Sequence, residues 1–337
     1  MKAVVLVGGE GTRLRPLTET VPKPLLPLVD RPILDHVLDR LVAHGVDEVL
    51  MSSPYLEDTF RPFIETRGGV PAITWVTEQQ PLGTGGAVVS VLDRLGEEPF
   101  FALNGDILTD LDLTRMVASH RSHGAAATIA LHRVEDARSF GLVATDPTGR
   151  ITAFREKPPD PVPGEINAGT YVLEPSALRA WTPDTYLWIE GEVFPRMIAE
   201  RLPMIGFASD AYWLDLGTPE QYLRAHADLL AGEVEGVSYP APWIATGASV
   251  APTARVGRSV AIGAHARVEA GADLDEAVLM TGAVVEKDAS VLRSIVGVGG
   301  RVGAGAALAD SVLGAGVGVP AGERLEGVRL GSGGPDR

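Results

Sequence analysis

Residues 8–24 (GGEGTRLRPLTETVPKP) combine glycines with cationic side chains directly after an apolar run at residues 3–7. Glycine lets backbone amides approach an anion closely and accepts positive φ angles. Arg13 offers a forked phosphate contact, whereas Lys23, restricted by a proline on each side, offers a point charge. These residue types and this spacing predict a loop that binds a nucleoside triphosphate.

Two better-known phosphate-binding motifs fit this loop poorly. A P-loop ends in Gly-Lys-Ser/Thr, whereas Gly11 is followed by Thr12 and Arg13. The dinucleotide-binding pattern G-x-G-x-x-G matches at Gly9 and Gly11 but has Leu14 in place of its third glycine. On the residues alone, a surface loop with solvated charges is the remaining alternative.

Further motifs extend the pattern over nearly the whole chain. With GGEGTRLRPLT and PKP they resemble the signature of the sugar-1-phosphate nucleotidyltransferases, or nucleotide-sugar pyrophosphorylases, and are closest to the bacterial mannose-1-phosphate guanylyltransferases. The resemblance implies transfer of a nucleoside monophosphate from an NTP, with GTP favoured, to a sugar 1-phosphate, with mannose 1-phosphate favoured. Pyrophosphate is released and an NDP-sugar forms. The motifs are TEQQPLGTGGA (77–87), NGD (104–106), REKP (155–158), INAGTY (166–171) and WLDLGTP (213–219).

The resemblance also implies which residues act. An oxygen of the sugar phosphate attacks the α-phosphorus, so charge neutralisation and positioning carry the catalysis. It assigns a Mg²⁺ cofactor to Asp106 and Asp215, the triphosphate to Arg13 and Lys23, and the sugar's phosphate to Lys157. By itself, Asn-Gly-Asp at Asp106 is also good turn chemistry. The implied nucleotide-binding residues are Leu6, Gly8, Gly9, Gly11, Thr12, Glu78, Gly83 and Thr84, and the implied sugar-binding residues are Gly141, Glu156, Asn167 and Gly169.

Glu156 and Lys157 are adjacent, and we expect them to point in opposite directions on an extended segment. Glu156 would then accept hydrogen bonds from sugar hydroxyls. The alternative is a salt bridge from Glu156 to Lys157 or Arg155.

Glu78 is the residue that we expect to recognise the base. It lies five residues before Gly83, where uridylyl- and thymidylyl-transferring relatives carry a glutamine. An ionised carboxylate only accepts hydrogen bonds, which suits the two adjacent donors of guanine but not the carbonyl oxygens of uracil or thymine. The sugar is less determined, because Trp188 stands where mannose-type enzymes carry a small serine. Another nucleotide, glucose 1-phosphate or a cyclitol phosphate is therefore the alternative.

Strand and helix patterns alternate up to about residue 230, which predicts an α/β fold with a Rossmann-like, mixed but mostly parallel sheet. Ligands of such sheets bind beyond the carboxyl ends of the strands, where the loop at Gly8 lies. The predicted strands are residues 3–7, 46–51, 73–76 and 99–103, and the predicted helices are residues 33–42, ended by Gly45, and 85–95.

A different pattern begins at Ile244, where aliphatic residues recur every six positions. Three registers then repeat every seventeen residues, which predicts a left-handed parallel β-helix of hexapeptide repeats rather than a low-complexity linker. The expected domains are a catalytic domain (1–232), a linker (233–243) and the β-helix (244–330). The registers are Ile262, Leu279, Val296 and Leu313; Val268, Val285, Val302 and Val319; and Leu274, Val291, Leu308 and Leu325.

Composition limits the function classes. The 337 residues include 29 basic and 44 acidic side chains, so the net charge is −15, which argues against nucleic acid or an anionic membrane as partner. The absence of cysteine excludes disulfides and thiolate metal sites. With only a short apolar run near its start and no run of about 20 apolar residues, we expect a cytoplasmic protein. The low-charge coils are compatible with a homo-oligomer.

Two rival functions are weaker. Hexapeptide acyltransferases use a histidine in the coils, and His265 is the only histidine after His226, with no inserted loop beside it. A non-catalytic regulatory subunit would be expected to lose the phosphate-binding cations or the metal carboxylates, which are all present here.

Overall fold

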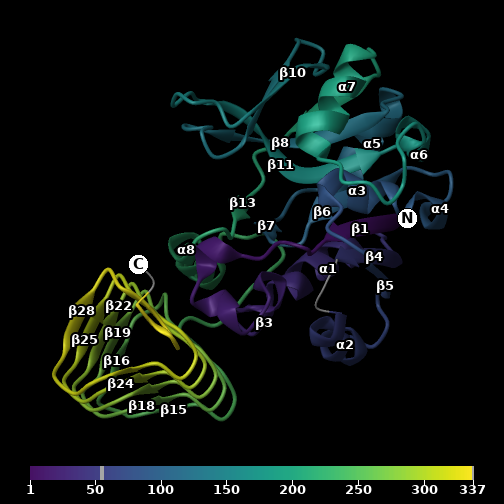
Figure 1. Ribbon diagram of the computed structural model, residues 1–337. Coiled ribbons are helices and arrows are strands. Elements are labelled where there is room, and N and C mark those ends of the chain that lie inside the picture. The colour runs from purple at the N-terminus through teal and green to yellow at the C-terminus, as the bar shows by residue number, and fades with distance from the viewer. Residues whose placement is uncertain (54–56, 336–337) are drawn as a thin grey trace. The chain divides into compact units, whose positions relative to one another are not determined.

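The structure is a computed structural model that describes residues 1–53 and 57–335 (Figure 1). Its contacts divide the chain into two compact units. The first unit contains residues 1–9 and 37–213, and the second contains residues 10–36 and 214–337. The segment after the first strand therefore packs with the C-terminal part of the chain.

The first unit is built on a nine-stranded mixed sheet of the predicted Rossmann-like class. Strands β5, β4, β1 and β6 run parallel, and antiparallel strands extend the sheet beyond β6. Leu6 pairs with Ser52 and Asn104, so the carboxyl ends of three parallel strands meet at one edge. The strands are β1 (Lys2–Leu6), β4 (Glu48–Ser53), β5 (Ala72–Thr77), β6 (Phe100–Asn104), β8 (Ala127–Val134), β9 (Gly141–Thr145), β10 (Ile151–Glu156), β11 (Gly164–Leu173) and β12 (Met204–Ala208).

Short helices connect these strands. The continuous helix predicted over residues 85–95 is wrong, because the chain forms α3 and α4 with a break at Ser90 and Val91. The Ser90 hydroxyl donates to the Ala87 carbonyl at 3.0 Å, a local bond that competes with helix continuation. The helices are α1 (Ile33–Ala43), α2 (Glu57–Thr66), α3 (Gly83–Val89), α4 (Leu92–Leu95), α5 (Leu113–Ser122), α6 (Pro175–Leu178), a π-helical turn (Ile189–Val193) and α7 (Phe194–Ala199).

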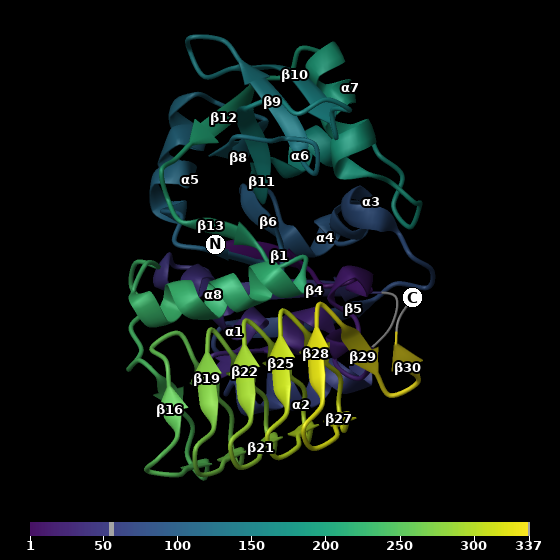
Figure 2. The ribbon, with the colours of Figure 1, turned by 90° about the vertical axis from the view of Figure 1, so that its left-hand side faces the viewer.

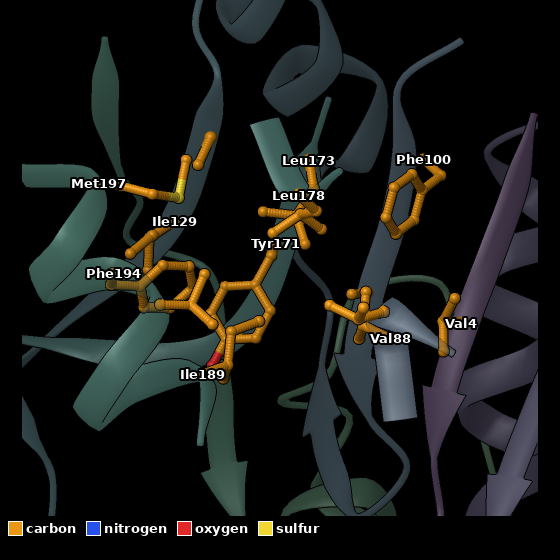
Figure 3. Packing of buried hydrophobic residues seen from close by; sticks show 14 of the residues in the cluster. Val4, Val88, Phe100, Ile129, Tyr171, Leu173, Leu178, Ile189, Phe194 and Met197 are labelled. Carbon is orange, nitrogen blue, oxygen red and sulfur yellow. The ribbon is translucent and has the colours of Figure 1, made fainter. Parts of the chain in front are cut away.

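An apolar core holds the antiparallel part of the sheet against these helices (Figure 3). Tyr171 on β11 is fully buried, and its ring meets that of Phe194 edge-on with centroids 5.2 Å apart. Ile189 and Val88 belong to the same cluster. The core thus fixes β11, α3 and the π-helical turn to one another, and all three carry predicted site residues or their hydrogen-bond partners.

The C-terminal part of the second unit is the predicted left-handed parallel β-helix, whose strands stack in three parallel sheets (Figure 2). All residues of the three predicted registers are buried except Leu325, which is half-buried in the last coil. Ile244 in the first coil is 44% exposed. The stacks begin with β14 (Trp243–Ile244), β15 (Ser249–Val250) and β16 (Arg255–Val256), and their last parallel strands are β29 (Arg329–Gly331), β27 (Gly318–Val319) and β28 (Arg324–Glu326). The antiparallel strand β30 (Gly334–Pro335) follows β29.

Residues 10–36 and helix α8 (Pro219–Ala231) complete the second unit. The Thr218 side chain caps α8 by accepting from the Gln221 backbone amide, and the buried Tyr222 hydroxyl donates to the Pro27 carbonyl. The segment holds short 3-10 turns at Thr12–Leu14, Leu17–Glu19 and Lys23–Leu25. Among the described residues, no helix has the length and apolar character that a membrane span requires.

Candidate active site

A pocket of about 370 Å³ lies in the first unit at the carboxyl ends of β1, β4 and β6. It collects most of the predicted nucleotide-binding residues together with Asp106, which comes shortly after β6. Gly11 and Thr12 belong to the second unit. The lining residues are Leu6, Gly8, Gly9, Ser52, Glu78, Pro81, Leu82, Gly83, Thr84, Ala87, Asn104, Asp106 and Tyr186.

Glu78 lines this pocket with a carboxylate that is held in place from two sides. The Ser52 hydroxyl donates to Oε1 at 2.8 Å, and the Leu82 backbone amide donates to Oε2 at 2.9 Å. The residue is only 8% exposed. An ionised carboxylate has about four acceptor positions, so it can accept two further hydrogen bonds. Glu78 therefore presents a fixed acceptor pair, which matches two adjacent donors on a ligand.

Glycines at the start of α3 let a distant segment close on the pocket. Gly83 has a φ of 69°, and a Cβ there would lie 2.7 Å from the Leu187 carbonyl oxygen. The amides of Gly85 and Gly86 donate to the same carbonyl at 2.8 and 3.1 Å. This packing brings Tyr186, which is 68% exposed, to the pocket wall. No sequence signal marks Tyr186, because it lies about a hundred residues beyond Gly83.

Glu190, in the π-helical turn, links the pocket to the predicted sugar-binding residues. The Thr84 hydroxyl donates to Oε2 at 3.0 Å, and the Tyr171 hydroxyl donates to Oε1 at 3.2 Å. Asn167 in turn donates to the Tyr171 hydroxyl at 2.8 Å, and its Oδ1 accepts from the Gly169 amide at 3.0 Å. Glu190 is absent from the residues predicted for the site. A π-helical turn is common at functional sites.

Burial raises the pKa of Glu190 above its usual value of about 4.5, and the hydrogen bonds from Thr84 and Tyr171 only partly offset it. The protonated form is therefore stabilised by folding, and this contribution is lost as pH rises through the raised pKa. We expect Glu190→Gln to gain stability relative to the parent as pH rises from about 4.5 to 8. Chemical denaturation of both proteins across this range measures the difference.

The surface variant Glu200→Gln is the control for this experiment, since the Glu200 side chain is 50% exposed. A difference between Glu190→Gln and the parent that stayed constant with pH would contradict the assigned shift.

Glu156 and Gly141 face each other in the register of β10 and β9. A Cβ at position 141 would lie 2.9 Å from Glu156 Oε2, so glycine leaves room for the carboxylate. Lys157 has a φ of 43°, and its ammonium lies 3.4 Å from Glu156 Oε1. The expectation of an extended segment is wrong at Lys157, because β10 ends at Glu156 and the backbone turns left-handed. The alternative of a salt bridge to Lys157 is the arrangement present.

The second unit brings Arg13, Lys23 and Asp215 together. Lys23 Nζ lies 3.4 Å from Asp215 Oδ1, and Arg13 Nη2 lies 3.8 Å from Asp215 Oδ2. Lys23 is 7% exposed, whereas the Arg13 side chain is 64% exposed. A Cβ at Gly217 would lie 2.7 Å from Arg13 Nη2, so glycine there admits the guanidinium. Two cations thus converge on one carboxylate.

Gly11 shapes the turn that carries these cations. It has a φ of 62°, and a Cβ there would meet Thr18 at 3.0 Å and Lys23 Cβ at 3.1 Å. The Thr18 hydroxyl donates to the Gly11 carbonyl at 2.8 Å. Thr12 begins the 3-10 turn that contains Arg13. The glycine-rich turn is therefore held against its own downstream chain.

Comparison with known proteins decides the family. Residues 2–232 match a family model described as nucleotidyl transferase, and residues 239–330 match one described as the GMPPB C-terminal domain. The chain belongs to the nucleotidyl transferase family. The predicted family, its reaction class and the fold are thus confirmed, and the protein is an enzyme.

Relatives of this nucleotidyltransferase span most of its length. A mannose-1-phosphate guanylyltransferase of Mycobacterium tuberculosis is 38% identical over 302 residues, covering 86% of this chain and 83% of that protein. A probable mannose-1-phosphate guanylyltransferase 2 of Arabidopsis thaliana is 37% identical, covering 87% and 85%. Among solved structures, HddC from Yersinia pseudotuberculosis complexed with GMP-PN has a TM-score of 0.59 at 27% identity, covering 66% of this chain and 97% of that one.

Proposed function

We propose that this nucleotidyltransferase joins GTP to mannose 1-phosphate, forming GDP-mannose and releasing pyrophosphate. The observation that carries the choice of base is the Glu78 carboxylate, buried in the pocket and fixed by Ser52 and Leu82. The ring N–H and amino group of guanine are the donor pair that such an acceptor suits. The names of the relatives from Mycobacterium tuberculosis and Arabidopsis thaliana support the same substrate pair.

Nucleotidyltransferases of this type generally use a divalent metal, and we propose Mg²⁺ with Asp106 and Asp215 as its protein ligands. The donor set fits this ion, which is commonly held by one or two carboxylates and completed by substrate phosphates and water. Among the described residues, no group of three or more His, Cys, Asp or Glu side chains gathers. When bound, Mg²⁺ would neutralise phosphate charge.

We assign the remaining steps to cations and hydrogen-bond acceptors of the chain. Arg13 and Lys23 would stabilise the triphosphate and the charge that develops on the leaving pyrophosphate. Lys157, whose side chain is 64% exposed, would hold the phosphate of the sugar. Binding of that phosphate would draw Lys157 from Glu156, leaving the carboxylate to accept from sugar hydroxyls. Gly141, Asn167 and Gly169 are proposed to complete the sugar pocket.

Glucose 1-phosphate and a cyclitol phosphate are the alternative substrates because Trp188 stands where mannose-type enzymes carry a small serine. Its ring lies against Gly191, its backbone amide donates to Glu192 at 2.8 Å, and it is 38% exposed. Trp188 is not among the described residues that line the pocket, whereas Tyr186 is. Because this pocket collects the predicted nucleotide-binding residues, the placement of Trp188 does not distinguish between sugars. The names of the relatives favour mannose 1-phosphate over glucose 1-phosphate or a cyclitol phosphate.

The test is pyrophosphate release measured for every combination of GTP, ATP, UTP, CTP and dTTP with mannose 1-phosphate, glucose 1-phosphate and a cyclitol phosphate. GTP with mannose 1-phosphate should give the highest kcat/KM. A clear preference for UTP or dTTP would discard the assignment of the base.

Glu78→Gln is expected to reduce the preference for GTP over UTP. The amide replaces one acceptor by a donor that faces the donors of guanine, a cost of about 1–3 kcal/mol, or roughly 5-fold to 150-fold in relative kcat/KM. The measurement is the same nucleotide series at a fixed concentration of mannose 1-phosphate. Glu65→Gln, at an exposed position, is the matched control. An unchanged nucleotide preference in Glu78→Gln would show that other groups recognise the base.

A further inference from the structure

Residues 10–36 pack against the last coils of the β-helix within the second unit. A Cβ at Gly314 would lie 3.1 Å from Pro16 Cβ, and a Cβ at Gly331 would lie 2.7 Å from Glu19 Oε1. These two glycines are seventeen residues apart, one in each of two successive coils. The segment that carries Arg13 therefore rests closely on the end of the β-helix.

Arg329, on β29, makes the polar contact of this packing. Its Nη1 donates to the Arg13 carbonyl oxygen at 3.1 Å, and its Nη2 donates to Glu220 Oε1 on α8 at 3.1 Å. Partial burial acts to raise the pKa of Glu220, but hydrogen bonds from Thr218, from its own backbone and from Arg329 outweigh burial, so the pKa is lowered. One guanidinium thus joins three segments: the loop, α8 and the last coil.

The identity of residue 329 departs from the repeat. In the strand register of this sheet, Arg329 comes after a row of apolar residues, one per coil. The row begins with Trp243, which is half-buried in the first coil, and its next four residues are at most 4% exposed, so the row is otherwise an apolar packing surface. An arginine at the end of such a row is not required by the coil itself. The four residues between Trp243 and Arg329 in the row are Ala261, Val278, Ile295 and Val312.

We propose that Arg329 is a positioning residue for the triphosphate: it fixes the backbone of the 3-10 turn Thr12–Leu14 and thereby the direction of the Arg13 guanidinium. This rests on the proposed role of Arg13 in binding the NTP. The Arg13 side chain is 64% exposed and approaches Asp215 at 3.8 Å, so the direction of its guanidinium depends on the backbone of the turn as well as on this carboxylate. A hydrogen bond that holds the Arg13 carbonyl restricts the backbone conformations of the turn. Less conformational entropy of this turn is then lost when the phosphates of the NTP bind.

The β-helix then contributes to substrate binding, and loss of the Arg329 side chain should weaken binding of the NTP but not of the sugar phosphate. Arg329→Ala is expected to raise KM for the NTP about 5-fold to 10-fold, the loss of roughly one charge-assisted hydrogen bond. KM for the sugar phosphate should stay within about 2-fold, because the two hydrogen bonds that define the role of Arg329 go to Arg13 and Glu220, neither of which is assigned to the sugar. Arg329→Lys should recover part of the loss, since one ammonium can reach one of the two acceptors.

The experiment compares the parent enzyme, Arg329→Ala, Arg329→Lys and the control Arg255→Ala, using whichever NTP the parent turns over. Arg255 also pairs with a carboxylate on the β-helix, that of Asp273, but is far along the stack from the last coil. Initial rates of pyrophosphate release give both KM values and kcat. Thermal unfolding of the four proteins shows whether a loss results from reduced stability.

Equal changes in both KM values, or an NTP KM in Arg329→Ala equal to that of Arg255→Ala, would overturn the proposal. So would a loss that tracks the unfolding temperature and is absent when the assay is cooled. Failure of the proposed function is a separate outcome: the parent would then release no pyrophosphate with GTP and mannose 1-phosphate, whatever residue 329 is.

Discussion

Replacing Asp215 with asparagine is expected to lower kcat by about 10²-fold to 10³-fold, the scale of removing one preorganised charge from a transition state. The carboxylate lies 3.4 Å from the Lys23 ammonium and 3.8 Å from the Arg13 guanidinium, and we assign it to the metal. Asparagine keeps the shape of the side chain but removes the negative charge that Lys23, Arg13 and the proposed Mg²⁺ would share. Pyrophosphate release at saturating GTP, mannose 1-phosphate and Mg²⁺ measures the effect.

Asp210→Asn is the matched control, because Asp210 is an exposed carboxylate five residues earlier in the chain. It should keep kcat within about 2-fold of the parent, as surface substitutions usually do. If Asp215→Asn also kept most of its kcat, Asp215 would have neither the metal nor the electrostatic role assigned to it.

Lys23→Met is expected to lower kcat/KM for GTP by roughly 10²-fold, mainly through the chemical step. Lys23 is 7% exposed, on a 3-10 turn between Pro22 and Pro24, so its ammonium is directed with little freedom. Methionine fills a similar volume without the charge. Steady-state rates over a GTP series measure the loss, and Lys287→Met, whose parent side chain is 68% exposed, is the control.

The combination of Lys23→Met with Asp215→Asn distinguishes a shared role from separate ones. If both residues serve one charge arrangement, the double variant should lose far less than the product of the single losses. Fully multiplicative losses would mean that the 3.4 Å contact between the two side chains has no catalytic consequence.

Features with a strict repeat or a fixed spacing were the most predictable from the sequence. The β-helix registers were placed correctly because each coil must bury one aliphatic residue per face, and eleven of the twelve are buried. Glu78 was found by its spacing to Gly83, and both line the pocket. The roles of the individual residues remain predictions until the variants are measured.

Residues recruited across long separations were missed. Tyr186 and Glu190 reach the pocket region because the segment that follows Thr185 packs against α3, about a hundred residues away in the sequence. The left-handed turn at Lys157 was missed for a related reason. A lysine has no intrinsic preference for positive φ, so only the surrounding fold accounts for it.

The division of the chain into two compact units has a consequence for how such enzymes diversify in evolution. Residues 10–36 share a compact unit with the β-helix and not with the nine-stranded sheet whose strands lie on both sides of them in sequence. A recombination event that exchanged only the tail would leave Pro16 and Glu19 facing unfamiliar residues in place of Gly314 and Gly331. Swapped tails should therefore be inherited together with matching changes near the amino terminus, so that two distant stretches of the gene evolve as one module.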